Sequence, residues 1–147
     1  MPQGPEGLRR VSGPSPIKVP PAALGAKLVL LFSFRIAGWG CVAAIVVLSL
    51  VPGGARPDTG VPGQINHMIA YCGTASLLGL GHPAAKSRLG AVVMLTLLAA
   101  VLEVLQLWVP GRHPQFIDFA SSAAGTCLGM LVAVMVHRLA LNPRWPL

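Results

Sequence analysis

Four apolar runs, separated by short polar segments, organise the sequence after its first 26 residues. They cover about residues 28–51, 65–81, 89–109 and 116–139. A helix rises about 1.5 Å per residue, so a run of about 20 apolar residues is long enough to cross a hydrocarbon core of roughly 30 Å. The pattern therefore predicts an all-α integral membrane protein, a bundle of four transmembrane helices.

The second run is the shortest, and polar side chains recur along one of its helical faces. His67, Tyr71 and Thr74 follow one another at intervals of four and three residues. Because a polar face is costly against lipid, we expect this face to point into the bundle. Arg35 interrupts the first run, and we expect its charge to reach the inner membrane interface.

The fourth run carries a small residue at every fourth position. A stripe of this kind lies on one helical face and lets two helix backbones approach closely. We therefore predict that it is a helix-packing surface. Its members are Ser121, Gly125, Gly129 and Ala133.

Composition supports a membrane protein. Hydrophobic residues make up 54% of the chain and charged residues 10%, whereas soluble domains contain roughly 25% charged residues. The net charge of +7 raises the question of nucleic-acid binding. The basic residues lie beside the apolar runs and are not interleaved with aromatic residues, so we predict no nucleic-acid partner.

The distribution of basic residues predicts which side each loop occupies. With four spans, the N-terminal segment, the second loop and the C-terminus share one side of the membrane. Positive charge favours the cytoplasm, so both termini are expected there (N-in/C-in). The opposite loops hold only Arg56 and Arg112. The basic residues on the predicted cytoplasmic side are Arg9, Arg10, Lys18, Lys27, Lys86, Arg88, Arg138 and Arg144.

The ends of the chain are expected to lie outside the bundle. Residues 1–26 are rich in proline and glycine and contain few large apolar side chains, so a disordered cytoplasmic tail is predicted. Residues 27–141 form the predicted membrane domain, and residues 142–147 form a C-terminal tail. Cys41, Cys72 and Cys127 each fall in an apolar run without the spacing of a metal site. We therefore expect no disulfide, no metal site and no cofactor.

Two of the four acidic residues, Glu103 and Asp118, lie in the most apolar half of the chain. The four-span arrangement places them at the outer interface together with Gln106, Arg112 and His67. A carboxylate at this depth needs a partner or a proton, and an arginine offers a planar set of donors. We expect these groups to form a small polar pocket. Separate local roles stay open: a helix start for Asp118 or His67, and a loop charge for Arg112.

Four segments resemble, in the same order, motifs of the VanZ-like family of small bacterial membrane proteins. They are "LSLVP", "HMIAY", "EVLQLWVPGR" and "DFASSAAGTCLG", which cover residues 49 to about 130. The chain departs from the family at Gly63-Gln64, where an Asp-Lys pair is usual, and at Ser122, where asparagine is usual. The resemblance implies that the family's motif positions are His67, Tyr71, Glu103, Gln106, Arg112, Asp118, Gly125 and Gly129.

The resemblance also implies a cellular setting, the bacterial cytoplasmic (inner) membrane, and a role in the cell envelope. The family is named for a protein linked to resistance to the glycopeptide antibiotic teicoplanin. Three functions follow as hypotheses. The first is binding of a membrane lipid headgroup, an anionic cell-wall precursor or a lipophilic glycopeptide at the outer pocket. The second is an enzyme that acts on a lipid-linked substrate by carboxylate and histidine acid–base chemistry. The third is a small proton-linked transporter, which would require a homo-oligomer.

Overall fold

The computed structural model describes residues 21–55 and 60–141, and every regular element in these two ranges is a helix. The predicted all-α class is therefore confirmed, while the predictions for residues 1–20 and 142–147 lie outside the described residues. Two short 3-10 helices, η1 (Gly53–Ala55) and η2 (Gln106–Trp108), follow the first and third α-helices. The α-helices are α1 (Pro21–Leu50), α2 (Gly63–Gly81), α3 (Ala85–Leu105) and α4 (Phe116–Leu141).

Three helical segments are long and apolar enough to cross a membrane. They are Leu24–Leu50, Ala85–Trp108 and Phe116–Ala140. Large apolar side chains cover the outside of these helices, in amounts that a water-soluble surface rarely shows. Exposed examples are Val29, Phe32, Leu97, Leu107, Phe116 and Leu139. This surface is compatible with a multi-pass membrane protein.

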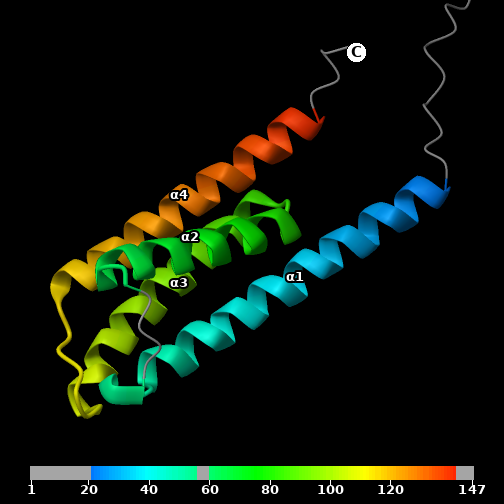
Figure 1. Cartoon of the computed structure of the whole chain (residues 1–147). Coiled ribbons are helices and arrows are strands. Elements are labelled where there is room, and N and C mark those ends of the chain that lie inside the picture. Colours follow the sequence, from blue (N-terminus) through cyan, green and yellow to red (C-terminus); the bar gives the residue numbers. More distant parts are fainter. Residues whose placement is uncertain (1–20, 56–59, 142–147) are drawn as a thin grey trace, which may run out of the picture.

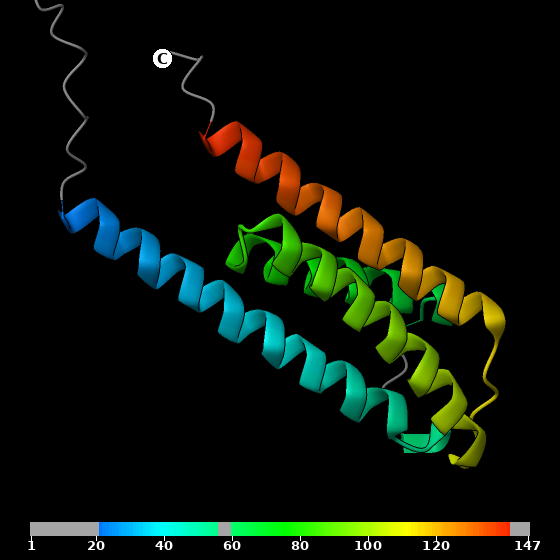
Figure 2. The same cartoon turned by 180° about the vertical axis from the view of Figure 1, so that it is seen from behind.

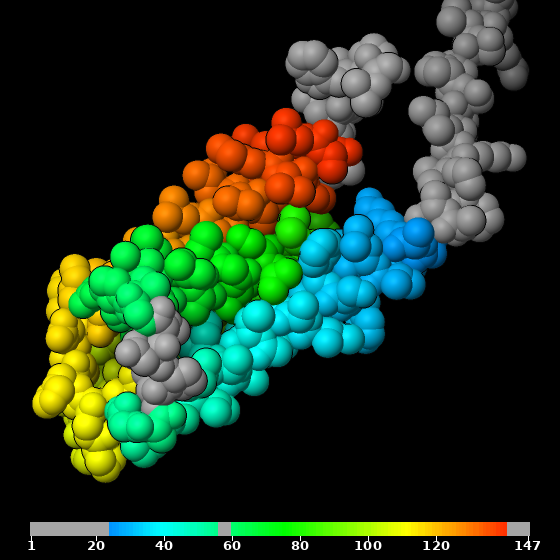
Figure 3. All heavy atoms as spheres, in the orientation of Figure 1, coloured from blue at the N-terminus to red at the C-terminus, as the bar shows by residue number. Residues whose placement is uncertain are grey.

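α2 is the helix around which the others are arranged. It packs against α1, α3 and α4, and most extensively against α4. α3 lies behind α2 in Figure 1 and in front of it in Figure 2, which shows the molecule from the opposite side. In the space-filling view, α2 lies between α4 and α1 on the visible face (Figure 3). Because its neighbours shield it, α2 can carry more polar side chains than a helix surrounded by lipid.

The contact between α2 and α4 depends on glycines that allow backbone to meet backbone. A Cβ atom at Gly125 would overlap the carbonyl oxygen of Met68, and one at Gly129 would overlap that of Cys72. Gly129 also accepts a hydrogen bond through its carbonyl oxygen from Ser76 Oγ, 3.1 Å away. Two members of the small-residue stripe thus lie directly on the α2 backbone, and Ala133 of the same stripe is fully buried.

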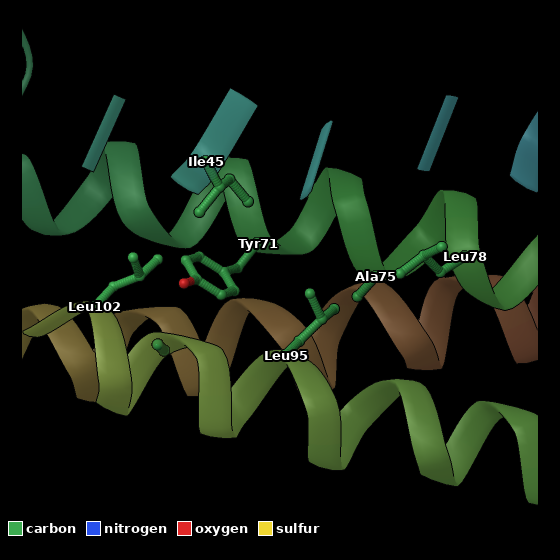
Figure 4. Packing of buried hydrophobic residues seen from close by; sticks show 7 residues of the cluster. Ile45, Tyr71, Ala75, Leu78, Leu95 and Leu102 are labelled. Carbon is green, nitrogen blue, oxygen red and sulfur yellow. The ribbon is translucent and has the colours of Figure 1, made fainter. Parts of the chain in front are cut away.

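The core of the bundle lies between α1, α2 and α3. Its largest side chain is Tyr71, which is 2% exposed and lies among aliphatic side chains (Figure 4). Thr74 is also buried, one turn along α2, and its hydroxyl donates to the Ala70 carbonyl oxygen. The polar face of α2 therefore points into the bundle. The apolar residues of the buried cluster are Ile45, Ala75, Leu78, Leu95, Ala99 and Leu102.

α1 begins earlier than the hydrophobic pattern predicts, at Pro21 and not near residue 28, so residues 21–26, predicted to belong to a disordered tail, are helical. Proline suits the first turn of a helix, because its missing N–H would have no partner there. The residues that follow include three alanines and two leucines before residue 29, which favour helix despite modest hydrophobicity. The apolar pattern indicates which part of a helix can contact lipid. The high helix propensity of the residues before residue 28 extends α1 beyond that part.

Two arginines stabilise the C-terminal end of α2. Arg35 on α1 donates from Nε to the Gly81 carbonyl oxygen at 2.7 Å, and Arg88 on α3 donates from Nε to the Gly79 carbonyl oxygen at 3.1 Å. Carbonyls at a helix end have no partner within the helix, and they carry partial negative charge. α2 ends at Gly81, partway along the longer α1. Arg35 of α1 therefore caps the C-terminal end of α2.

Candidate functional site

The alternating directions of the four helices bring their ends together at one end of the bundle. The C-terminal ends of α1 and α3 lie there with the N-terminal ends of α2 and α4 (Figures 1 and 2). His67 is in the second turn of α2, Glu103 is near the end of α3, and Asp118 is in the first turn of α4. Residues that are distant in sequence thus reach the same depth in the fold.

The structure places three of the candidate residues in one cluster. One side-chain nitrogen of His67 and one carboxylate oxygen each of Glu103 and Asp118 lie within 4.8 Å of one another. All three side chains are half-buried. We call this set the acidic–histidine cluster.

The side chains around this cluster leave several polar atoms without partners. Within the described part of the chain, Glu103 Oε2, Asp118 Oδ1 and Gln106 Nε2 are buried and accept or donate no hydrogen bond. Gln106 as a whole is 3% exposed, one helical turn beyond Glu103. The backbone N–H of Gln115 lies beside the Glu103 carboxylate. A buried polar atom without a partner costs about 1–3 kcal/mol, so such a group is often completed by a ligand or water.

Tyr71 takes a different position from the one that a polar pocket suggests. Its ring belongs to the apolar core, and the Glu103 charge reaches it from the neighbouring helix. Figure 4 shows the ring pointing from α2 toward Leu102 of α3. Tyr71, which the sequence assigned to the polar pocket, is therefore part of the apolar core.

Arg112 is placed at the end of α1. Its Nε donates to the Val51 carbonyl oxygen at 3.2 Å, and its Nη2 donates to the Leu48 carbonyl oxygen at 2.5 Å. The sequence led us to expect Arg112 to approach Glu103 or to pair with Asp118. The positive charge of Arg112 does stabilise the ionised form of Glu103. The two hydrogen bonds, however, bind carbonyl oxygens at the C-terminal end of α1. That role was missed because backbone carbonyls at helix ends leave no mark in the side-chain pattern.

The same end of the bundle is held by a backbone contact between two loops. The Gly53 N–H donates to the Pro110 carbonyl oxygen at 3.1 Å. A Cβ atom at Gly53 would overlap the Gly111 carbonyl oxygen, and Gly111 itself has a positive φ of 73°. Both positions therefore require glycine. This contact and Arg112 together fix the α3–α4 loop, which carries one side of the site, against the end of α1.

Arg112→Gln is expected to lower the free energy of unfolding by about 1–2 kcal/mol, because two charge-assisted hydrogen bonds to α1 are lost. Thermal unfolding of the purified protein in detergent would measure this. The matched control is Arg138→Gln, which removes an exposed arginine from the last turn of α4. Equal melting temperatures for the two variants would show that the contacts of Arg112 with α1 do not stabilise the fold.

An open groove of about 360 Å³ lies beside the cluster, between the end of α3 and the start of α4. This volume is in the usual range of about 300–1,000 Å³ for small-molecule sites. Two phenyl rings, of Phe116 and Phe119, lie 5.9 Å apart on one wall. Glu103 is the one charged side chain among the lining residues. These are Ala100, Glu103, Val104, Leu107, Pro114, Gln115, Phe116 and Phe119.

The sequence pattern did not predict this groove. Its aromatic wall exists because the linker from Gly111 to Gln115 turns back and starts α4 beside the end of α3. Phe116 and Phe119 are three residues apart, which is the only sequence signal for a shared wall. That spacing is equally typical of an ordinary lipid-facing helix surface.

Taken together, these features define a bundle of apolar helices with a polar cluster at one end and an open, largely apolar groove beside it. Comparisons with protein-family models, with curated proteins and with solved structures each found no match.

Proposed function

We propose that this chain is a VanZ-like protein of the bacterial cytoplasmic membrane that binds an amphipathic lipid. The apolar part of the ligand lies in the groove against Phe116 and Phe119, and its polar headgroup reaches the acidic–histidine cluster. The observation that carries this proposal is the position of Glu103, which belongs to both the groove and the cluster. A ligand with one apolar and one polar part fits such a junction.

The mostly apolar lining of the groove favours a ligand that has an apolar part. Each methylene group buried in an apolar groove contributes about 0.8 kcal/mol relative to water. A lipid already in the bilayer gains less from this burial, so its selection depends on the headgroup. The buried, unpartnered atoms of Glu103, Asp118 and Gln106 supply polar groups for that purpose. A lipid headgroup and a lipid-linked cell-wall precursor share this chemistry, and so does a lipophilic glycopeptide such as teicoplanin.

The proposal places the cluster at the outer face of the membrane, with both termini in the cytoplasm. α2 then acts as a fourth span: its 19 residues extend about 28 Å, close to the thickness of a hydrocarbon core. Among the described residues, the basic side chains at the opposite helix ends support this orientation, and these are Lys27, Lys86, Arg88 and Arg138. Reporter fusions after Arg56 and after Arg112 are expected to report an outside location, and a fusion after Lys86 an inside one. An outside location for the Lys86 fusion would contradict the topology.

The test of the binding function is the lipid content of the purified protein. Protein extracted in a mild detergent is expected to retain a lipid, and blocking the groove with Ala100→Trp is expected to remove it. Mass spectrometry of the extracted lipid would identify the headgroup.

The geometry also supports a second candidate, an enzyme that acts on a lipid-linked substrate. His67 lies within 4.8 Å of both carboxylates, which suits proton transfer once a substrate brings the groups closer. The same mass spectrum separates the two functions. An intact lipid supports binding, whereas a lipid cleaved at its headgroup supports catalysis.

A further inference from the structure

Three helices each bring one side chain with a metal-ligating atom to a single point. We propose that His67, Glu103 and Asp118 bind one divalent transition-metal ion. Their ligand atoms lie within 4.8 Å of one another. The sequence predicted no metal site, because each ligand comes from a different helix and none shows the short spacing of a known motif.

Charge and burial favour a cation at this point. Two carboxylates held close together repel each other, and the surrounding apolar helices weaken solvent screening. One oxygen of each carboxylate, Glu103 Oε2 and Asp118 Oδ1, is buried without a hydrogen-bond partner. A divalent cation would balance both charges and occupy both oxygens. Buried charges are found paired or bound to metal, since an uncompensated one is costly.

The ligand types indicate which ions fit. One imidazole nitrogen with two carboxylate oxygens suits Zn²⁺ or Mn²⁺, whereas Ca²⁺ and Mg²⁺ prefer oxygen ligands alone. Ligand atoms around a tetrahedral ion lie about 3.4 Å apart when each bond is about 2.1 Å. The three ligand atoms, which lie within 4.8 Å of one another, would therefore each have to move toward the ion by about 1 Å or less.

An ion with three protein ligands keeps open coordination positions, which is typical of sites that bind a further group. The open side would accept an anionic oxygen, such as that of a phosphate headgroup. This part of the inference rests on the proposed lipid-binding function. A bound metal ion would explain how a cluster with two carboxylates can hold an anion. Arg112 donates two of its hydrogen bonds to α1, so these two donors are not directed at such an anion.

The experiment measures metal binding without added lipid. The full-length protein, purified in detergent without a histidine tag and stripped with a chelator, is titrated with Zn²⁺ and with Mn²⁺ by calorimetry. One ion per chain is expected to bind to the wild type. Loss of an outer partner of a metal ligand already costs roughly 10–100-fold in affinity, so removing a direct ligand should cost about 100-fold or more. The variants are His67→Gln, Glu103→Gln and Asp118→Asn, which preserve most of each side chain's shape.

The matched control is His113→Ala, which removes an exposed histidine from the α3–α4 loop and should leave binding unchanged. Addition of the bound metal should also raise the melting temperature of the wild type and of His113→Ala. It should leave the melting temperature of the three ligand variants unchanged, and this readout shows at the same time that each variant is folded. Failure of the wild type to bind either ion, or equal binding by all four variants, would overturn the metal site. If the protein binds the metal but retains no lipid, the metal site is supported and the proposed binding of a headgroup to the metal is contradicted.

Discussion

Gly129→Leu is expected to prevent α2 and α4 from packing in their present arrangement. Even the first carbon of a side chain at this position would overlap the Cys72 carbonyl oxygen. The helix backbones would have to separate, which would also lengthen the hydrogen bond from Ser76 to Gly129. Overpacking in a well-packed interior costs typically about 1–3 kcal/mol, and a clash with backbone is at the upper end or beyond it. We expect a large fall in melting temperature or a failure to purify as a folded protein.

The matched control for this prediction is Gly73→Leu. Gly73 lies on α2 as well, but its position faces open space, with no atom within 4 Å of an added Cβ. A leucine there adds the same volume to the same helix pair without meeting a backbone. Gly125→Leu should behave like Gly129→Leu, because its Cβ would overlap the Met68 carbonyl oxygen. Equal stability of Gly129→Leu and Gly73→Leu would refute the close-packing account.

The sequence predicted the helices well because apolar runs and helical spacing report directly on the environment of a side chain. The inward direction of Tyr71 and Thr74 followed from their spacing and from the cost of polar groups in lipid. The partner of the small-residue stripe could not be predicted in the same way. Gly125 and Gly129 pack on backbone atoms, and backbone atoms are identical at every position of the sequence.

The site was predicted in part for the same reason. Glu103, Asp118 and His67 could be assigned to one depth from helix direction and length alone, and the structure brings their ligand atoms together. Their joint use as a metal site could not be predicted, because it depends on how three helices are rotated about their axes. From its charge, Arg112 was expected to pair with the carboxylates. In the structure its guanidinium also donates hydrogen bonds to two backbone carbonyl oxygens at the end of α1.

Ala100→Trp is expected to displace most of the lipid that the wild-type protein retains. Ala100 is a small, half-buried residue that lines the groove on α3, so an indole ring there would occupy space meant for the ligand. Because the indole ring excludes the apolar part of the ligand from the groove, binding is expected to weaken by about tenfold or more, which corresponds to about 1.4 kcal/mol. Val104→Trp, on the same wall, is a second variant that should act alike if Ala100→Trp does not fold.

The matched control is Leu97→Trp, which adds an indole ring to the same helix. Leu97 is exposed on α3 and is not among the residues that line the groove. Comparable melting temperatures for Ala100→Trp and Leu97→Trp would show that any difference in lipid content arises from the groove itself.

The most direct test of the account is quantitative mass spectrometry of the lipid bound to these proteins, purified side by side in the same detergent. The account predicts that the wild type and Leu97→Trp carry the same lipid with a polar headgroup in similar amounts. It also predicts at least about tenfold less of this lipid on folded Ala100→Trp or Val104→Trp. Equal amounts on all four proteins, or no lipid on the wild type, would contradict the claim that the groove and the acidic–histidine cluster form one binding site.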